Sequence, residues 1–221
     1  MTVEVVPWLI IGGAAAALGG LVLVSLARNR KRRASYAEYA LIRGFTFEAQ
    51  RADWEQRYAG VLDLFNEGHR HVWGNTISGT KNQLPFTAFE YRWVTGGGKS
   101  SSTHYICGVV WERDGVAFPR FALSPEGWLS RIGQLFGMQD IDFDDSPEFS
   151  RQYQLKGPDE SAIRTLFTPE IRRFLESTPD QHVAGGGHTL IWFRRGTLPS
   201  AEQLDEFLEL GDQVRRRFLS S

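Results

Sequence analysis

An uninterrupted apolar stretch near the amino terminus is the feature that most constrains this chain. Residues Val5 to Ala27 read VVPWLIIGGAAAALGGLVLVSLA and contain no charged side chain. At about 1.5 Å per residue, a helix of this length can cross a hydrocarbon core of about 30 Å. The sequence therefore predicts a single transmembrane helix that binds the lipid bilayer and anchors the rest of the chain.

Charges on the two sides of the stretch predict its orientation. Glu4 is the only charge in front of it, whereas five basic residues lie in the run Arg28 to Arg33 behind it. Because Lys and Arg accumulate on the cytoplasmic side, we expect a single-pass inner (plasma) membrane protein with a cytoplasmic carboxyl-terminal domain. A cleavable signal peptide would be shorter and preceded by its charges. We also expect the basic run to bind anionic lipid headgroups, at about 1 kcal/mol per residue.

Small residues recur at helical spacing inside the predicted anchor. Gly12, Ala16 and Gly20 fall on one helix face. Such stripes let two helices approach closely, which predicts a homo-oligomer formed through these residues. The alternative is that small residues are simply common in membrane helices.

The remainder of the chain is long enough for one domain with its own core. We therefore divide the chain into residues 1–33, the anchor and basic flank, and residues 34–221, a cytosolic domain. From Ala34 onward, 20 basic and 25 acidic side chains give a formal charge of −5. A mildly acidic domain does not favour nucleic acid as a partner. Cys107 is the only cysteine, so the chain forms no internal disulfide.

Between residues 69 and 123, apolar and polar side chains alternate, and β-branched and aromatic residues are frequent. This period is typical of strands. We expect four antiparallel strands, with a tight hairpin at Asp114-Gly115 joining the last two. Apolar residues on both sides of the third strand indicate that both faces of the sheet are covered. The four strands are residues 71–78, 86–95, 104–113 and 116–123.

Shorter signals place the other elements. Further strands are expected at residues 45–48, 149–156, 181–184 and 188–194. Helix-capping residues predict helices that begin near Ser35, Asp53, Ser124, Asp159, Thr168 and Ser200. Together these elements predict an α+β fold, in which helices pack against an antiparallel sheet of six or seven strands.

The last predicted helix carries a regular apolar stripe. Its members are Leu204, Phe207, Leu208, Gly211, Val214 and Phe218. This spacing predicts a helix docked on the sheet as part of the core. In the alternative, the helix is a free amphipathic arm whose residues Arg215, Arg216 and Arg217 reach for anionic lipid.

A glycine-rich stretch, Gly96 to Ser100, invites comparison with a phosphate-binding loop. The motif requires an earlier glycine where Trp93 stands, and a helix must follow, whereas the next segment reads as a strand. We therefore interpret the stretch as a hairpin loop and predict no cofactor-binding residues.

Candidate metal ligands are scattered rather than grouped. Asp140, Asp142 and Asp144 have the spacing that begins a calcium loop, but Asp145 and Arg151 replace its required glycine and glutamate. The histidines lack the helical spacing of zinc helices; they are His69, His71, His104, His182 and His188. The sequence predicts no metal site.

No catalytic residues emerge either. A Gly-x-Ser-x-Gly elbow is absent from the sequence, and Cys107 lies in a strand where burial would raise its pKa and blunt it. The remaining candidate is an apolar groove lined by Trp73, Trp93 and Trp111, against the simpler interpretation that these aromatic residues belong to the core.

Several segments carry a resemblance to known sequences. They are Phe136 to Phe143 (FGMQDIDF), Phe149-Ser150-Arg151, Tyr153 to Gly157, Asp159 and Leu166-Phe167. Through them the chain resembles uncharacterised bacterial single-pass membrane proteins. The resemblance implies an anchored mixed domain and supplies no activity.

These observations predict a non-catalytic, membrane-tethered cytosolic module for binding or scaffolding. The alternative is a membrane-anchored hydrolase whose site is assembled from scattered residues. Convergent polar side chains in a cleft would favour the hydrolase, and an apolar patch on a closed surface would favour the binding module.

Overall fold

The computed structural model describes residues 5–128 and 140–219, without the side chains of residues 5–18 and Glu55. Residues 5–43 form one helix, α1 (Val5–Arg43), so the predicted anchor is helical. For most residues of the anchor, Gly12 and Ala16 among them, the structure describes only the backbone. Within what is described, no helix is both long and apolar enough to span a membrane.

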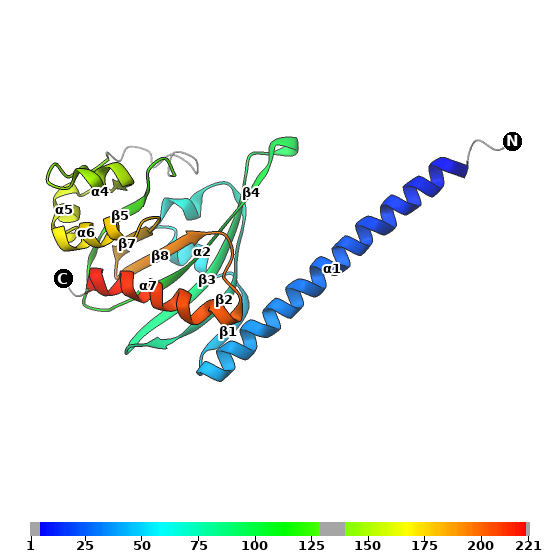
Figure 1. The fold of residues 1–221 in the computed structure, drawn as a ribbon, viewed down its shortest axis with the longest axis horizontal. Coiled ribbons are helices and arrows are strands. Elements are labelled where there is room, and N and C mark those ends of the chain that lie inside the picture. Colours follow the sequence, from blue (N-terminus) through cyan, green and yellow to red (C-terminus); the bar gives the residue numbers. More distant parts are fainter. Residues whose placement is uncertain (1–4, 129–139, 220–221) are drawn as a thin grey trace.

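One antiparallel sheet of eight strands forms the centre of the described domain, which confirms the α+β class but exceeds the predicted six or seven strands. Its order is β1-β2-β3-β4-β8-β7-β5-β6 (Figure 1). The strands are β1 (Thr46–Arg51), β2 (His69–Lys81), β3 (Leu84–Thr95), β4 (Ser102–Glu112), β5 (Phe118–Pro125), β6 (Tyr153–Lys156), β7 (His182–Gly187) and β8 (Thr189–Arg195).

The predicted tight hairpin at Asp114-Gly115 is wrong. A turn does form there, with Gly115 at φ 81°, but β4 and β5 do not pair. The β7–β8 hairpin lies between them, with Val110 of β4 opposite Ile191 of β8 and Ala122 of β5 opposite Ala184 of β7. A later segment of the chain, β8, thus pairs with β4 in the place where the local turn signal predicted β5.

Both faces of the sheet are covered, as the third predicted strand indicated. Cys107, Val109 and Trp111 of β4 lie in one buried cluster, and Ile106 and Val110 lie in the other. The first cluster is closed by α1, α7 (Leu204–Leu219), α5 (Glu160–Leu166) and α6 (Pro169–Ser177). The second, the aromatic cluster, packs beneath α2 (Trp54–Tyr58) and the 3-10 turn η1 (Asp63–Asn66).

The helix predicted to begin at Ser35 is instead the continuation of α1. Ser35 Oγ donates to the carbonyl of Lys31 one turn earlier, so this residue lies mid-helix and caps nothing. In Figure 1 the amino-terminal half of α1 projects away from the sheet, and its last turns lie beside β1 and β2. The helix therefore passes without a break through the division at residues 33 and 34.

Three further sequence predictions are corrected. Ser124 and Pro125 belong to β5 rather than to the start of a helix, residues 126–128 form a turn, and the predicted helix from residue 129 onward lies outside the described residues. Residues 149–152 belong to α4 (Pro147–Gln152), because Pro147 and Glu148 favour a helix start. The helix predicted from Asp53 ends at Tyr58, and only the short turn η1 follows it.

The carboxyl-terminal helix α7 is docked on the sheet, so the free-arm alternative is wrong. All six residues of its predicted stripe are buried, and the Phe207 ring lies 4.9 Å from the ring of Trp192. Gly211 allows the close approach, because a Cβ atom there would lie 2.8 Å from the Trp192 ring. The helix caps predicted at Asp159 and Thr168 also form, each accepting a backbone N–H.

Candidate functional site

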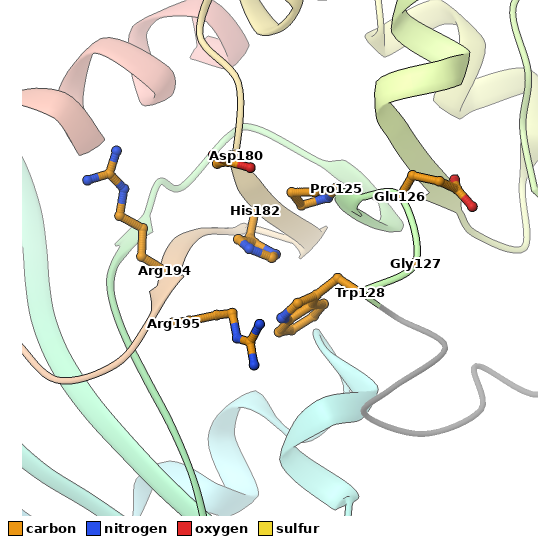
Figure 2. Close-up of a pocket in the computed structure, with 8 residues that line it drawn as sticks. All are labelled: Pro125, Glu126, Gly127, Trp128, Asp180, His182, Arg194 and Arg195. Atoms are coloured by element: carbon orange, nitrogen blue, oxygen red, sulfur yellow. The ribbon is translucent and has the colours of Figure 1, made fainter.

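A cavity of about 490 Å³ opens where β5 and β8 end and β7 begins. Two of its side chains, Trp128 and His182, are buried. In Figure 2 the Arg195 side chain extends toward the Trp128 ring, and Arg194 points away from it. The cavity is lined by Pro125, Glu126, Gly127, Trp128, Asp180, His182, Arg194 and Arg195. We call it the aromatic pocket.

His182 forms the inner wall of the aromatic pocket. Its ring stacks on Phe193 at 5.0 Å and meets the Trp128 ring edge-on at 4.4 Å. Its Nδ1 lies 3.0 Å from Ser124 Oγ, and both residues are buried. Burial, reinforced by the charges of Arg195 and Arg194, lowers the pKa of His182 to about 3. The imidazole is therefore neutral at physiological pH.

The Ser124–His182 pair joins two residue types found in hydrolase sites, but it does not suit that role. Ser124 is only 1% exposed, so a substrate carbonyl has no approach to its hydroxyl. A general base is most effective when its pKa lies near the working pH, and His182 lies far below. The pair satisfies two buried polar groups and positions the His182 ring.

The lowered pKa makes a prediction about stability. In the unfolded chain His182 binds a proton near pH 6.5, whereas in the folded chain it does so only near pH 3. Acidification between these two pH values therefore favours unfolding. From pH 7 to pH 5, we expect the unfolding free energy to fall by about 2 kcal/mol through this residue. Urea unfolding of the full chain in a mild detergent measures it. The variant His182→Gln is expected to lose that part of the pH dependence, and an unchanged slope would contradict the assignment.

A second cavity, of about 270 Å³, adjoins the aromatic pocket and shares Trp128 and Arg195 with it. Trp93 and Trp128 line it, and the Nε1–H groups of both are buried without a hydrogen-bond partner within the described part of the chain. Each of these two groups can donate a hydrogen bond to an acceptor that reaches it. The other residues lining it are Thr103, His104, Tyr105, Ile106 and Gly196.

Positive charge gathers at the mouth of the aromatic pocket. Arg195 is exposed and Arg194 half-buried. Arg194 lies over the Trp192 ring, 5.4 Å from its centroid. In residues 5–128 and 140–219, neither guanidinium forms a hydrogen bond or ion pair with another side chain. Arg195 can therefore offer its charge to an anion beside the aromatic wall, whereas Arg194 extends away from that wall.

The three tryptophans proposed to line a groove do not meet. Trp73 and Trp93 lie in the aromatic cluster, whereas Trp111 lies in the cluster on the opposite face of the sheet. Successive side chains of a strand point to opposite faces of the sheet. The register of β3 and β4 therefore puts Trp93 and Trp111 on different faces. Of the three, Trp93 alone reaches a described cavity.

The other sequence candidates are dispersed across the fold. The stretch Gly96 to Ser100 lies in the β3–β4 hairpin, as predicted. Burial raises the pKa of Cys107 to about 12, which also agrees with the prediction. Asp145 accepts two hydrogen bonds from Arg172, which hold the pKa of its carboxyl below the ordinary value. Among the described residues, no three His, Cys, Asp or Glu side chains form a group that could hold a metal.

Sequence reasoning passed over the residues that do converge. Arg194 and Arg195 directly follow five buried residues of β8. Two charged residues at the end of a buried strand were the signal that could have indicated this site. Trp128 was not recognised as a pocket residue, because it falls within the helix that was predicted to begin near Ser124. His182 was weighed only as a metal ligand.

The comparisons with known proteins bear on the fold. No protein-family model matches the chain, and no curated protein matches it. A solved structure, the mycobacterial trehalose monomycolate transport factor A (TtfA), matches with a TM-score of 0.57 and 12% sequence identity. The match covers 85% of this chain and 92% of that chain. At this identity the likeness establishes a shared fold alone.

Proposed function

We propose that the chain is a membrane-tethered module that binds an anionic amphipathic molecule in the aromatic pocket. The observation that supports this best is the position of the Arg195 side chain beside the buried rings of Trp128 and His182. Guanidinium groups bind carboxylates and phosphates, and an aromatic wall takes an apolar chain. One molecule that carries both groups satisfies both halves of the site.

The adjoining cavity favours the same kind of ligand as the aromatic pocket. The unpartnered Nε1–H groups of Trp93 and Trp128 can each donate to an oxygen of the bound molecule. Because the two cavities share Trp128 and Arg195, a ligand longer than either can occupy both. A lipid with an oxygen-rich polar head has this composition. The shared fold with TtfA, whose name describes transport of trehalose monomycolate, is in keeping with a lipid ligand.

The tether and its orientation are part of the proposal. The uncharged sequence Val5 to Ala27 spans the inner membrane as a helix, and the basic run Arg28 to Arg33 keeps the domain in the cytoplasm. The exposed side chains of Leu21, Val22 and Leu23 of α1 support contact with lipid. Pairing of two anchors through Gly12, Ala16 and Gly20 stays a prediction.

Quenching of tryptophan fluorescence tests the pocket. The full chain is placed in phosphatidylcholine nanodiscs and titrated with 8-bromooctanoate, whose bromine quenches an indole on contact. We expect saturable quenching, and Arg195→Gln is expected to weaken the affinity about tenfold because one charge-assisted contact is lost. Bromooctanol lacks the charge. Its affinity for the native protein is therefore expected to be no higher than the affinity of 8-bromooctanoate for Arg195→Gln.

A matched control separates the site from general attraction. Arg113→Gln removes an exposed arginine that lines neither cavity, and it is expected to leave the affinity unchanged. Equal weakening by the two variants, or quenching that never saturates, would reject the pocket as the binding site.

A further inference from the structure

A third cavity, of about 460 Å³, lies where α1 meets the sheet, and we call it the junction cavity. It combines the basic run that follows the predicted anchor with strands β2 and β3. Its lining residues from α1 are Asn29, Arg32 and Arg33. Those from the sheet and from the segment after β8 are Val72, Gly74, Asn75, Glu90, Arg92, Tyr105 and Thr197.

Two of the three arginines in the junction cavity lack an acidic partner. Arg32 is paired with Glu90 and also donates to the carbonyl of Leu198. Within the part of the chain that the structure describes, Arg33 and Arg92 form neither a hydrogen bond nor an ion pair through their side chains. The Glu90 carboxylate already has its own partners, because its Oε1 also accepts the N–H of Leu198 at 2.8 Å. The cavity therefore has two positive charges to offer an anion.

Asn75 adds a buried hydrogen-bond acceptor to the junction cavity. It is 5% exposed and adopts a left-handed conformation, with φ 46°, at an irregularity of β2. Its Nδ2 donates to the carboxylate of Glu90, which accepts only, so this contact fixes the orientation of the amide. The Oδ1 atom is then a buried acceptor, and it has no partner among the described residues. A ligand that supplies a hydroxyl donor would satisfy it.

We propose that the junction cavity binds a phosphate ester that carries a free hydroxyl group. Arg33 and Arg92 bind the phosphate oxygens, and Asn75 Oδ1 accepts the hydroxyl. Such a group occurs in the headgroup of phosphatidylglycerol and in soluble glycerol phosphates. The position of the cavity beside Arg28 to Arg33 favours the lipid headgroup, and only this choice of source rests on the proposed tether.

Calorimetry on the full chain tests the proposal. The chain is held in micelles of lauryldimethylamine oxide, which has no hydroxyl group, and is titrated with dihexanoylphosphatidylglycerol or with dihexanoylphosphatidylmethanol. The two probes carry the same charge, but only the first has a free hydroxyl. We expect the first to bind about tenfold more tightly, since the second leaves the Asn75 acceptor unpaired. Equal affinities would overturn the role of Asn75.

Arginine variants test the location of the phosphate. Arg33→Gln and Arg92→Gln are each expected to weaken binding of dihexanoylphosphatidylglycerol about tenfold, with unchanged melting temperatures because neither side chain is paired. Arg30→Gln removes a charge from the same basic run outside the cavity, and is expected to change the affinity less than twofold. An equal loss in Arg30→Gln and Arg33→Gln would overturn the site in favour of diffuse attraction.

Two further titrations identify the source and keep this proposal separate from the aromatic pocket. Glycerol 3-phosphate that binds as tightly as the lipid, with the same loss in Arg33→Gln, would support the site and assign it to a soluble ester. Quenching by 8-bromooctanoate is expected to be unchanged in Arg33→Gln and Arg92→Gln. The two sites can therefore fail independently.

Discussion

Replacing Phe207 and Leu208 together by alanine is expected to unfold the domain at ordinary temperatures. Both side chains are buried where α7 lies on the sheet, and Phe207 packs against Trp192. Each truncation of a buried side chain of this size costs about 2–5 kcal/mol. Their sum approaches the whole stability of a typical domain, which is about 5–15 kcal/mol. A melting curve of the full chain in detergent, followed by near-ultraviolet circular dichroism, measures the loss.

A control on the opposite side of α7 separates packing from helix propensity. Glu206 and Gln213 are exposed, so the double variant Glu206→Ala with Gln213→Ala is expected to keep its melting temperature within a few degrees. If the core variant melted like this control, α7 would not be part of the core.

The second large effect is expected at a buried ion pair within the same helix. Asp212 Oδ1 accepts from Arg215 Nε at 2.6 Å, and its Oδ2 accepts from Arg216 and from Asn82. Asp212 and Arg215 are 2% and 6% exposed. Asp212→Ala leaves the Arg215 charge buried without its partner, which typically costs about 3–5 kcal/mol. Urea unfolding of the full chain measures the cost.

Two further variants identify the cause of that cost. Glu209 pairs with Lys81 and Arg216 at the surface, where solvent screens the charges, so Glu209→Ala is expected to cost less than about 1 kcal/mol. Replacing both members of the buried pair, as Asp212→Leu with Arg215→Met, removes the unpaired charge and is expected to recover most of the loss. A double variant as unstable as Asp212→Ala would argue against the unpaired charge as the cause.

Local periodicity in the sequence predicted most of the sheet, because alternation along a half-buried strand is a property of the strand itself. Cys107 and Val110 fell on opposite faces, as expected. The order of strands was not predictable in this way. Pairing of β8 with β4 joins residues 106–112 to residues 189–195, and no local pattern encodes a contact between segments so far apart.

The candidate sites were less predictable than the fold, for a related reason. The aromatic pocket needs Trp128 from the turn after β5 and Arg195 from the end of β8, and these strands are separated in the sheet by β7. Asp212 and Arg215 lie only three residues apart, yet the apolar stripe around them gave no sign that both charges are buried. Burial of a charge depends on what packs against it, which a helical pattern does not specify.

The unbroken course of α1 from Val5 to Arg43 sets an angular relation between its two ends. Its last turns are fixed to the sheet, because Arg32 binds Glu90 and the Tyr36 hydroxyl donates to the carbonyl of Pro199. One residue inserted between Ala27 and Arg28 would therefore rotate the domain by about 100° about the helix axis, whereas seven residues, nearly two full turns, would restore the original azimuth about 10 Å farther along. The number of α1 residues between the amino-terminal segment and the sheet thus determines which side of the sheet faces any surface to which that segment is fixed.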